Sequence, residues 1–175
     1  MVTFKVKDFN HLSGVNSDLS DSSFFYNCLK RTITINNIKT NQHYNYQTIK
    51  DKLKRLVEIN NIIYADSSTN LVLLGLNTNT YTFPLAIRND NKNVCVAFNG
   101  NSSPFRGRSL RKGKNSLNAH NEMKINYIFS KHVKEQLYDN LVYTRNIKRL
   151  PCILVDYKTI LHPTILSRFS YITDI

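Results

Sequence analysis

The spacing of apolar residues changes once along this chain of 175 residues, and that change constrains the fold more than any other feature. Between residues 44 and 64, apolar side chains recur at the intervals of one helix face, at Ile49, Leu53, Leu56, Val57 and Ile63. Beyond residue 70 they form short runs or alternate with polar residues, as in strands, at 71–76, 81–87, 94–98 and 123–129. An earlier helix is expected from Ser20 or Asp21, both good N-caps, to about Arg31. Helices followed by strands predict an α+β fold, with N-terminal helices packed on a twisted antiparallel β-sheet.

The remaining segments carry weaker patterns. Residues 1–9 indicate a short strand or an extended arm, and residues 131–138 a short helix. A short strand is expected at 141–144, an apolar run occupies 152–155, and His162-Pro163 is expected to break regular structure. Since no linker or repeat divides the chain and its length suits one core, we expect residues 1–175 to form a single domain.

The chain is strongly basic, with 24 Lys and Arg against 12 Asp and Glu and a formal net charge of +12. This charge indicates a polyanionic partner, either a nucleic acid or a membrane surface. No run of about eighteen apolar residues is present, so we expect no spanning helix and no membrane partner. The first ten residues lack the apolar stretch of a signal peptide, and the three cysteines are widely spaced, which together favour a cytoplasmic protein.

The most basic stretch is Ser102–Ser116, with the sequence SSPFRGRSLRKGKNS and no acid. Its cations are Arg106, Arg108, Arg111, Lys112 and Lys114. Guanidinium groups bind phosphate oxygens in pairs, and glycines between them let a backbone approach a polyanion closely. We therefore predict a phosphate-binding loop at the edge of an RNA-processing site; a solvated basic loop is the alternative.

The sequence shows no local sign of a metal site or a nucleotide-binding motif. Its five histidines are scattered, and its acids form neither a DxD pair nor an ExxE motif. Any phosphodiester chemistry is therefore expected to need no metal and no other cofactor. Metal-free RNA cleavage requires a base for the ribose 2′-OH proton, an acid for the leaving 5′-oxygen, and cations around the phosphorus.

His11 is the strongest candidate for the acid or the base, because we expect it in a turn before the first helix, followed by Ser13 and Gly14. A histidine that only bonds backbone groups at a helix entry is the alternative. Tyr46 and Lys50 lie four residues apart and share a helix face, which is either an acid–base pair or simply an exposed face.

Several short motifs together resemble one family of nucleases. They are Phe9-Asn10-His11-Leu12-Ser13-Gly14-Val15, Phe24-Phe25-Tyr26 with Cys28-Leu29, Asn70-Leu71, Ser109-Leu110-Arg111-Lys112-Gly113, Ile128-Phe129-Ser130-Lys131, and Tyr138 with Leu141-Val142-Tyr143. This set is similar to the small phage- and mobile-element-borne nuclease domains of the barnase–EndoU–colicin–RelE superfamily, especially the group with an opening His-Leu-Thr-Gly and a later Ser/Thr-Leu-Leu-Lys-Gly signature. The resemblance runs from about residue 8 to 145, and residues 146–175 form a C-terminal extension.

The resemblance implies a barnase/RelE-like fold and a metal-independent endoribonuclease that acts as a toxin in a toxin–antitoxin or phage-defence system. It places the family's histidine at His11 and its threonine at Ser13. The second signature falls at Ser109 and Lys112, with Arg111 in place of a leucine. The implied partners are an RNA substrate and a cognate antitoxin, either RNA or protein.

We therefore predict an endoribonuclease that cleaves RNA through 2′-OH attack and leaves a 2′,3′-cyclic phosphate. The predicted catalytic residues are His11, Ser109, Lys112 and Arg111. The predicted RNA-binding residues are Ser13, Arg106, Arg108, Lys114, Lys131, Arg145, Lys148 and Arg149. The alternatives are a non-catalytic basic RNA-binding protein, and a viral phosphodiesterase that acts on cyclic nucleotides through His11, Tyr46 and Lys50.

Overall fold

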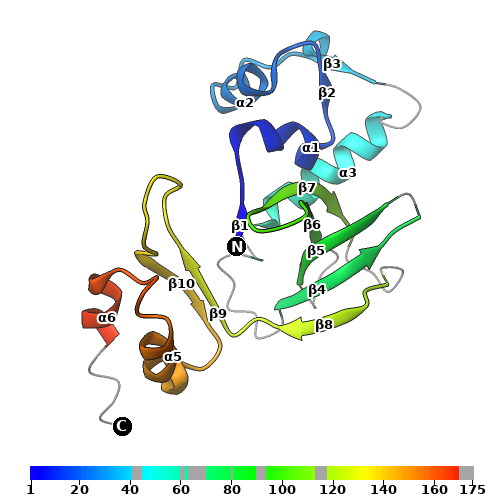
Figure 1. Cartoon of the computed structure of the whole chain (residues 1–175). Helices are drawn as coiled ribbons and strands as arrows, with labels where there is room; N and C mark the ends of the chain where they lie inside the picture. The colour runs from blue at the N-terminus through cyan, green and yellow to red at the C-terminus, as the bar shows by residue number, and fades with distance from the viewer. Residues whose placement is uncertain are drawn as a thin grey trace.

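The computed structural model is an α+β protein, and the predicted fold class is confirmed (Figure 1). It describes residues 1–40, 45–59, 62, 70–79, 81–89, 94–112 and 118–169. The N-terminal helices at residues 9–13 and 46–57 lie against one face of a six-stranded sheet, and the helix at 21–29 packs on the helix at 9–13. A smaller group of C-terminal strands and helices lies to one side. None of the helices in these ranges is both long and apolar enough to cross a membrane.

The N-terminal part contains the elements β1 (Val2–Thr3), α1 (Phe9–Ser13), β2 (Asn16–Ser17), α2 (Asp21–Leu29), β3 (Ile38–Lys39) and α3 (Tyr46–Val57). The predicted helices at α2 and α3 are present, and each begins at a side-chain cap. Ser20 accepts a hydrogen bond from the backbone of Ser23, and Asn45 accepts one from Thr48. The turn expected around His11 is wrong, because His11 lies on the short helix α1, which ends at Gly14.

The sheet has the strand order β1-β7-β6-β5-β4-β8. Its further strands are β4 (Asn70–Asn77), β5 (Thr82–Asn89), β6 (Cys95–Asn99), β7 (Phe105–Arg111) and β8 (Asn121–Lys124). Neighbouring strands are antiparallel, except that β1 pairs with β7 in parallel. The sheet is therefore mixed at one edge, where the sequence predicts an antiparallel sheet throughout.

The predicted basic loop is wrong for residues 105–111, which form the strand β7, and residues 113–116 lie outside the described residues. The backbone of β7 pairs along the whole of β6, from Cys95 opposite Arg111 to Asn99 opposite Arg106. The buried residues Gly107 and Leu110 lie three positions apart, yet they pair with Phe98 and Val96 on one face of the sheet, because the register of β7 shifts between them. The run of arginines hid this strand in the sequence.

The two faces of the sheet carry separate hydrophobic clusters. The first cluster lies under α1 and α3 and consists of Leu12, Ile62, Val94, Val96, Phe98 and Leu110. The second cluster lies on the other face and consists of Leu73, Leu76, Phe83, Ala86, Cys95 and Ala97. Burial raises the pKa of the Cys95 thiol to about 12, so this cysteine behaves as a small hydrophobic residue.

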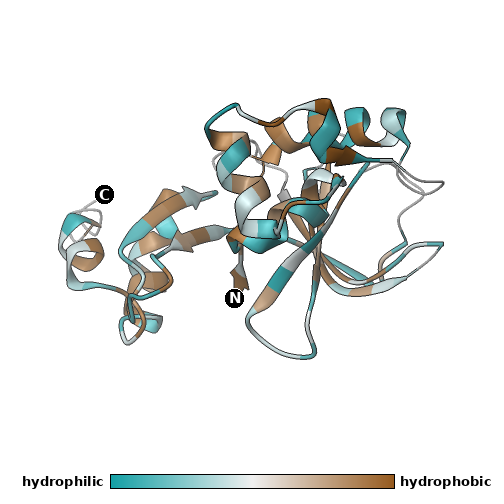
Figure 2. Ribbon diagram, turned by 90° about the horizontal axis from the view of Figure 1, so that it is seen from above, coloured by the Kyte–Doolittle hydropathy of each residue, from teal (hydrophilic) through white to brown (hydrophobic). Residues whose placement is uncertain are grey.

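Residues 127–169, here called the C-terminal unit, stand to one side of the six-stranded sheet (Figure 2). They contain a hydrophobic cluster of their own, built around Leu150, Leu154, Leu161 and Ile165. The unit contains β9 (Tyr127–Ser130), β10 (Asn140–Thr144), α5 (Leu150–Asp156) and α6 (Pro163–Phe169). The strand predicted at 123–129 is divided between β8 and β9, which belong to different sheets. No helix forms at 131–138, and Pro163 begins a helix instead of breaking structure, since proline fits the first turn.

Candidate active site

The candidate site lies where α1 meets β7. Leu12 of α1 and Leu110 of β7 belong to the same buried cluster. Gly107 makes room beside them for the Phe4 ring, because a Cβ there would lie 3.1 Å from that ring, whereas Leu12 Cδ1 would stay at an ordinary contact distance of 3.6 Å. His11, the residue before Leu12, is therefore held beside the arginines of β7.

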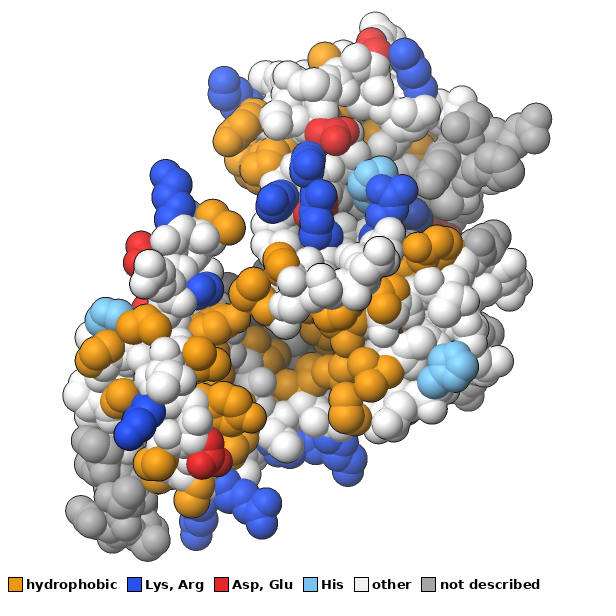
Figure 3. Space-filling view, in the orientation of Figure 1, with side chains coloured by type: hydrophobic (Ala, Val, Ile, Leu, Met, Phe, Trp, Pro, Cys, Tyr) orange, Lys and Arg blue, Asp and Glu red, His pale blue; other side chains and the backbone are white. Residues whose placement is uncertain are grey.

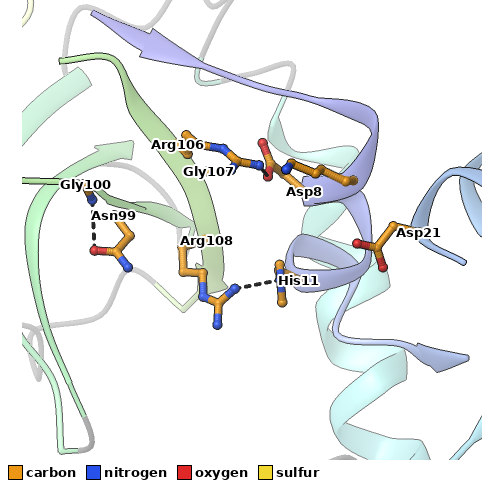
Figure 4. Close-up of a pocket in the computed structure, with 9 residues that line it drawn as sticks. Asp8, His11, Asp21, Asn99, Gly100, Arg106, Gly107 and Arg108 are labelled. Carbon is orange, nitrogen blue, oxygen red and sulfur yellow. Dashed lines mark hydrogen bonds and ion pairs between the residues drawn. The ribbon is translucent and has the colours of Figure 1, made fainter. Parts of the chain in front are cut away.

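His11 and Arg108 are in direct contact, although 97 residues separate them in the sequence (Figure 4). A bulge in β7 produces this contact: Ala97 pairs with Ser109 and Phe98 with Gly107, which leaves Arg108 as the extra residue. Arg108 Nη1 lies 2.6 Å from His11 Nε2. Since a guanidinium can only donate, Nε2 accepts this bond, and the neutral ring carries its proton on Nδ1.

A cavity of about 400 Å³ opens beside this pair. Its lining residues are Lys7, Asp8, His11, Asp21, Asn99, Gly100, Arg106, Gly107 and Arg108. Lys and Arg side chains gather around this junction of the N-terminal helices and the sheet (Figure 3). The cavity thus combines three cations and one imidazole with two carboxylates, of which Asp8 is already paired with Arg106, and its remaining cations suit a phosphate group.

Buried Asp8 fixes the position of Arg106. Its carboxylate accepts hydrogen bonds from the backbone of Lys5 at 2.9 Å and from Arg106 Nη2 at 2.5 Å. Asp8 is only 3% exposed, so it needs the guanidinium to compensate its charge. Asp21 on α2 accepts a bond from Asn10 at 2.7 Å and closes the far side of the cavity. Both carboxylates therefore hold neighbouring protein groups in position around the cavity.

The surroundings of His11 lower its pKa below the ordinary value of 6.5. Desolvation is the main cause, although part of the ring faces solvent, and the charge of Arg108 is the second. Asp21 and Asp8 oppose this shift, and Lys52 adds to it. At neutral pH the ring is therefore uncharged, which is the form that can accept a proton.

Lys52 of α3 lies next to this site, over Gly14. A Cβ on Gly14 would lie 2.2 Å from Lys52 Cδ and 3.1 Å from its Nζ, so the glycine makes room for the lysine. Gly14 also has a φ of 69°, which favours glycine. The pKa of Lys52 is lowered, first by burial and then by the charges of Arg111 and Arg55. Lys52 thus adds a partly desolvated cation between His11 and the end of β7.

The other predicted catalytic residues lie away from the cavity lining. Ser109 pairs with Ala97 and Arg111 with Cys95, so both face the second cluster, and the Arg111 guanidinium lies 5.3 Å from the centre of the Phe83 ring. Lys112 follows the end of β7 and is exposed.

Of the predicted RNA-binding residues, Arg106 and Arg108 line the cavity. Ser13 is fully buried, and its hydroxyl donates to the Asn10 carbonyl and accepts from the Val15 backbone, so it is not exposed to RNA. Lys114 lies outside the described residues.

Lys131, Arg145, Lys148 and Arg149 belong to the C-terminal unit, and none of them lines the cavity. Lys131 donates to the Gln136 carbonyl at 2.7 Å, and Arg145 donates to the Ile125 carbonyl at 3.1 Å. Lys148 and Arg149 are exposed. Tyr46 and Lys50 are exposed on α3 and are also absent from the cavity lining.

Sequence reasoning missed Lys7, Asp8, Asp21, Asn99 and Lys52 as members of this neighbourhood. Asp8 had a weak signal, because it is an acid three residues before the histidine of the His-Leu-Ser-Gly motif. Lys52 had none, since it lies in a helix with several other lysines. Within the described ranges, no group of three or more His, Cys, Asp or Glu side chains is placed to hold a metal ion.

One protein-family model, described as phage-Barnase-EndoU-ColicinE5/D-RelE like nuclease4, matches residues 1–146. No curated protein and no solved structure matches the chain. The match includes α1, the whole six-stranded sheet and the β9–β10 pair, and it ends before α5. It confirms the predicted superfamily and implies hydrolysis of a nucleic acid substrate. The chain therefore belongs to this family of phage barnase–EndoU–colicin E5/D–RelE-like nucleases.

Proposed function

We propose that this nuclease is a metal-independent endoribonuclease, with His11 as the base and Arg106 and Arg108 as the ligands of the scissile phosphate. The observation that carries the proposal is the contact of His11 with Arg108 at the mouth of a cationic cavity. A neutral imidazole and a guanidinium fork on one cavity supply a proton acceptor and phosphate donors within reach of the same nucleotide.

In the proposed reaction, the phosphate replaces His11 as the partner of Arg108, and this exchange frees His11 Nε2. Nε2 then takes the proton of the ribose 2′-OH, and the 2′-oxygen attacks the neighbouring phosphorus. The bond from phosphorus to the 5′-oxygen breaks, and the leaving oxygen takes a proton from solvent water. The products are a 2′,3′-cyclic phosphate and a 5′-hydroxyl.

The cations of the cavity stabilise the charge that develops on the phosphorane oxygens. Arg106 is already oriented by Asp8, so it needs little reorganisation when the phosphate arrives. Lys7 adds a third positive charge at the same cavity. We propose that exposed Lys112, directly after β7, holds RNA beyond the scissile phosphate. Ser109 and Arg111 face the second cluster and do not line the cavity, so the proposal gives them no contact with the phosphate.

The proposal is tested by incubating purified protein with RNA in the presence of EDTA. We expect cleavage products that end in a 2′,3′-cyclic phosphate, and a loss of kcat/KM of roughly 10²- to 10⁴-fold in His11→Asn. His132→Asn is the matched control, because His132 is exposed on the C-terminal unit. Equal cleavage of a substrate with a single 2′-deoxy sugar at the scissile position would exclude 2′-OH attack.

We further propose that the chain acts in the cytoplasm as a toxin of a toxin–antitoxin or phage-defence system, inhibited by an RNA or protein antitoxin. Membership of this nuclease family and the net charge of +12 support the proposal. Expression in bacteria should arrest growth, and expression of His11→Asn should not. RNA binding without turnover would instead favour the non-catalytic alternative. The cyclic-nucleotide alternative loses support, because Tyr46 and Lys50 do not line the cavity.

A further inference from the structure

An exposed tyrosine stands beside the cationic cavity. Tyr81, directly before β5, is 48% exposed, and its hydroxyl donates to Asn99 Oδ1 at 3.2 Å. Asn99 itself lines the cavity. Three other tyrosines are similarly exposed, but of these four only Tyr81 is hydrogen-bonded to a cavity residue in the part of the chain that the structure describes. The position of Tyr81 is therefore tied to the site.

The Tyr81 ring rests on a buried aromatic support. Phe83 is 3% exposed, and the two ring centres lie 4.8 Å apart in an edge-to-face arrangement. The Arg111 guanidinium lies at the Phe83 ring, so a cation stands near the same aromatic pair. A ring held in this way can stack a planar group with little loss of conformational entropy.

Asn99 adds directional hydrogen bonding. Its Oδ1 accepts from the Tyr81 hydroxyl and, at 2.9 Å, from the backbone of Gly100. The two N–H groups of its amide are therefore on the side away from Gly100, as Figure 4 shows. Such donors suit the carbonyl oxygens and ring nitrogens at the edge of a nucleobase.

We propose that Tyr81 and Asn99 bind one nucleobase of a single-stranded RNA, with Tyr81 stacking on the base and Asn99 donating to its edge. The proposal rests on the proposed function, because it takes the cavity as the phosphate site of that RNA. The base belongs to a nucleotide adjoining the bound phosphate. Double-stranded RNA does not fit this site, because its bases are already stacked and paired.

The chain contains no tryptophan, so Tyr81→Trp creates a single fluorescent reporter at this position. The probe is a short single-stranded oligonucleotide with 2′-O-methyl sugars, which cannot be cleaved by 2′-OH attack. We expect this oligonucleotide to quench the Trp fluorescence in a saturable way. Tyr46→Trp is the control, since Tyr46 is 63% exposed on α3 and does not line the cavity, and its signal should not change.

Affinity measurements complete the test. Tyr81→Ala should weaken binding of the oligonucleotide on the order of 10- to 100-fold, because each stacked base contributes strongly. Tyr81→Phe keeps the ring and should retain most of the affinity. An oligomer with abasic sugars should bind weakly and leave the reporter unquenched.

The outcomes separate this proposal from the proposed function. Cleavage of RNA by the wild type together with unchanged binding by Tyr81→Ala would overturn the base site and leave the nuclease mechanism intact. Quenching of the reporter without any RNA cleavage would overturn the mechanism and support the base site. Equal quenching by the abasic oligomer would also overturn the base site.

Discussion

At the scale of single residues, the contact between His11 and Arg108 is central to the proposed mechanism. In the free protein the Arg108 guanidinium donates a hydrogen bond to Nε2 of His11, and in the proposed complex it binds the phosphate instead. Desolvation lowers the pKa of the imidazole, and the charge of Arg108 adds to that shift, so the ring is held neutral. A lysine would supply the charge but not the planar fork that holds a phosphate at two oxygens. The contact thus keeps His11 in the neutral form that can accept a proton and holds Arg108 where it can bind the phosphate.

The first prediction concerns the titration of His11. Because burial and Arg108 both lower its pKa, His11 should protonate below pH 6.5, and the bond from Arg108 should be lost as the pH falls through that value. Arg108→Gln removes the charge and part of the burial, so the midpoint should move up toward 6.5. Histidine NMR signals followed from pH 8 to pH 4.5 measure both midpoints, and His11→Asn assigns the signal.

Lys54→Gln is the matched control for this titration, since Lys54 is an exposed cation on α3. It should leave the His11 midpoint unchanged. A midpoint that stays in place or falls in Arg108→Gln would contradict the electrostatic role given to Arg108. The acid limb of kcat/KM should follow the same midpoints, because protonated His11 cannot accept the 2′-OH proton.

At the scale of elements, the site depends on how the five-residue helix α1 is fixed between α3 and β7. So short a helix is not stable alone and is held by tertiary packing. Leu12 packs in one cluster with Leu110 of β7, and Gly14 lets Lys52 of α3 lie across the helix end. The glycine of the His-Leu-Ser-Gly motif therefore has a packing role as well as a conformational one.

The second prediction is that Gly14 and Lys52 are energetically coupled. Gly14→Ala should destabilise the protein by about 1–2 kcal/mol through its left-handed conformation alone. In the wild type it should cost more, because the new Cβ displaces Lys52, and in a Lys52→Ala background this extra cost should disappear. Urea unfolding of the single and double variants gives the coupling energy.

Gly100→Ala serves as the control for the cycle, because its Cβ would meet the Ser102 carbonyl and the Phe105 ring instead. Its cost should be the same with and without Lys52. An equal cost of Gly14→Ala in both backgrounds would show that Lys52 does not occupy the space over Gly14.

Elements with local signals could be predicted from the sequence, and elements defined by distant partners could not. Both α2 and α3 have a capping residue and helical spacing within their own segments. The strand β7 is recognisable only through its pairing with β6, and its arginines favour a loop when read alone. The apolar residues of α5 are visible in the sequence, but they span too few positions to show a helical period.

The same distinction applies to the site. His11 is a candidate from residue chemistry and from the family resemblance, Arg108 is one from residue chemistry alone, and both roles remain predictions. Their contact depends on a bulge that no local pattern announces. Asn99 and Lys52 carry no local signal, since their importance comes from what folding places beside them.

At the scale of the whole molecule, the Lys and Arg side chains that give the net charge of +12 lie both around the six-stranded sheet and on the C-terminal unit. One group of cations surrounds the cavity between α1 and β7, and another lies on the C-terminal unit. In that unit, Lys131 and Arg145 already bond backbone carbonyls, whereas Lys148 and Arg149 are exposed. If RNA reaches the C-terminal unit, these two exposed side chains are its best contacts.

The third prediction therefore concerns the salt dependence of RNA binding. Each phosphate neutralised on a single strand contributes about 0.7 to the slope of log affinity against log salt, so Lys148→Ala/Arg149→Ala should reduce that slope by about 1.4. Lys30→Ala/Lys39→Ala removes the same charge from exposed positions near α2 and β3, and should leave the slope nearly unchanged. The Kd of the 2′-O-methyl oligonucleotide at several salt concentrations measures both slopes. If the slope of Lys148→Ala/Arg149→Ala equals that of the control double variant, the C-terminal unit does not bind RNA. The RNA is then confined to the α1–β7 cavity and its surroundings, because counterions are released only where phosphates contact cations.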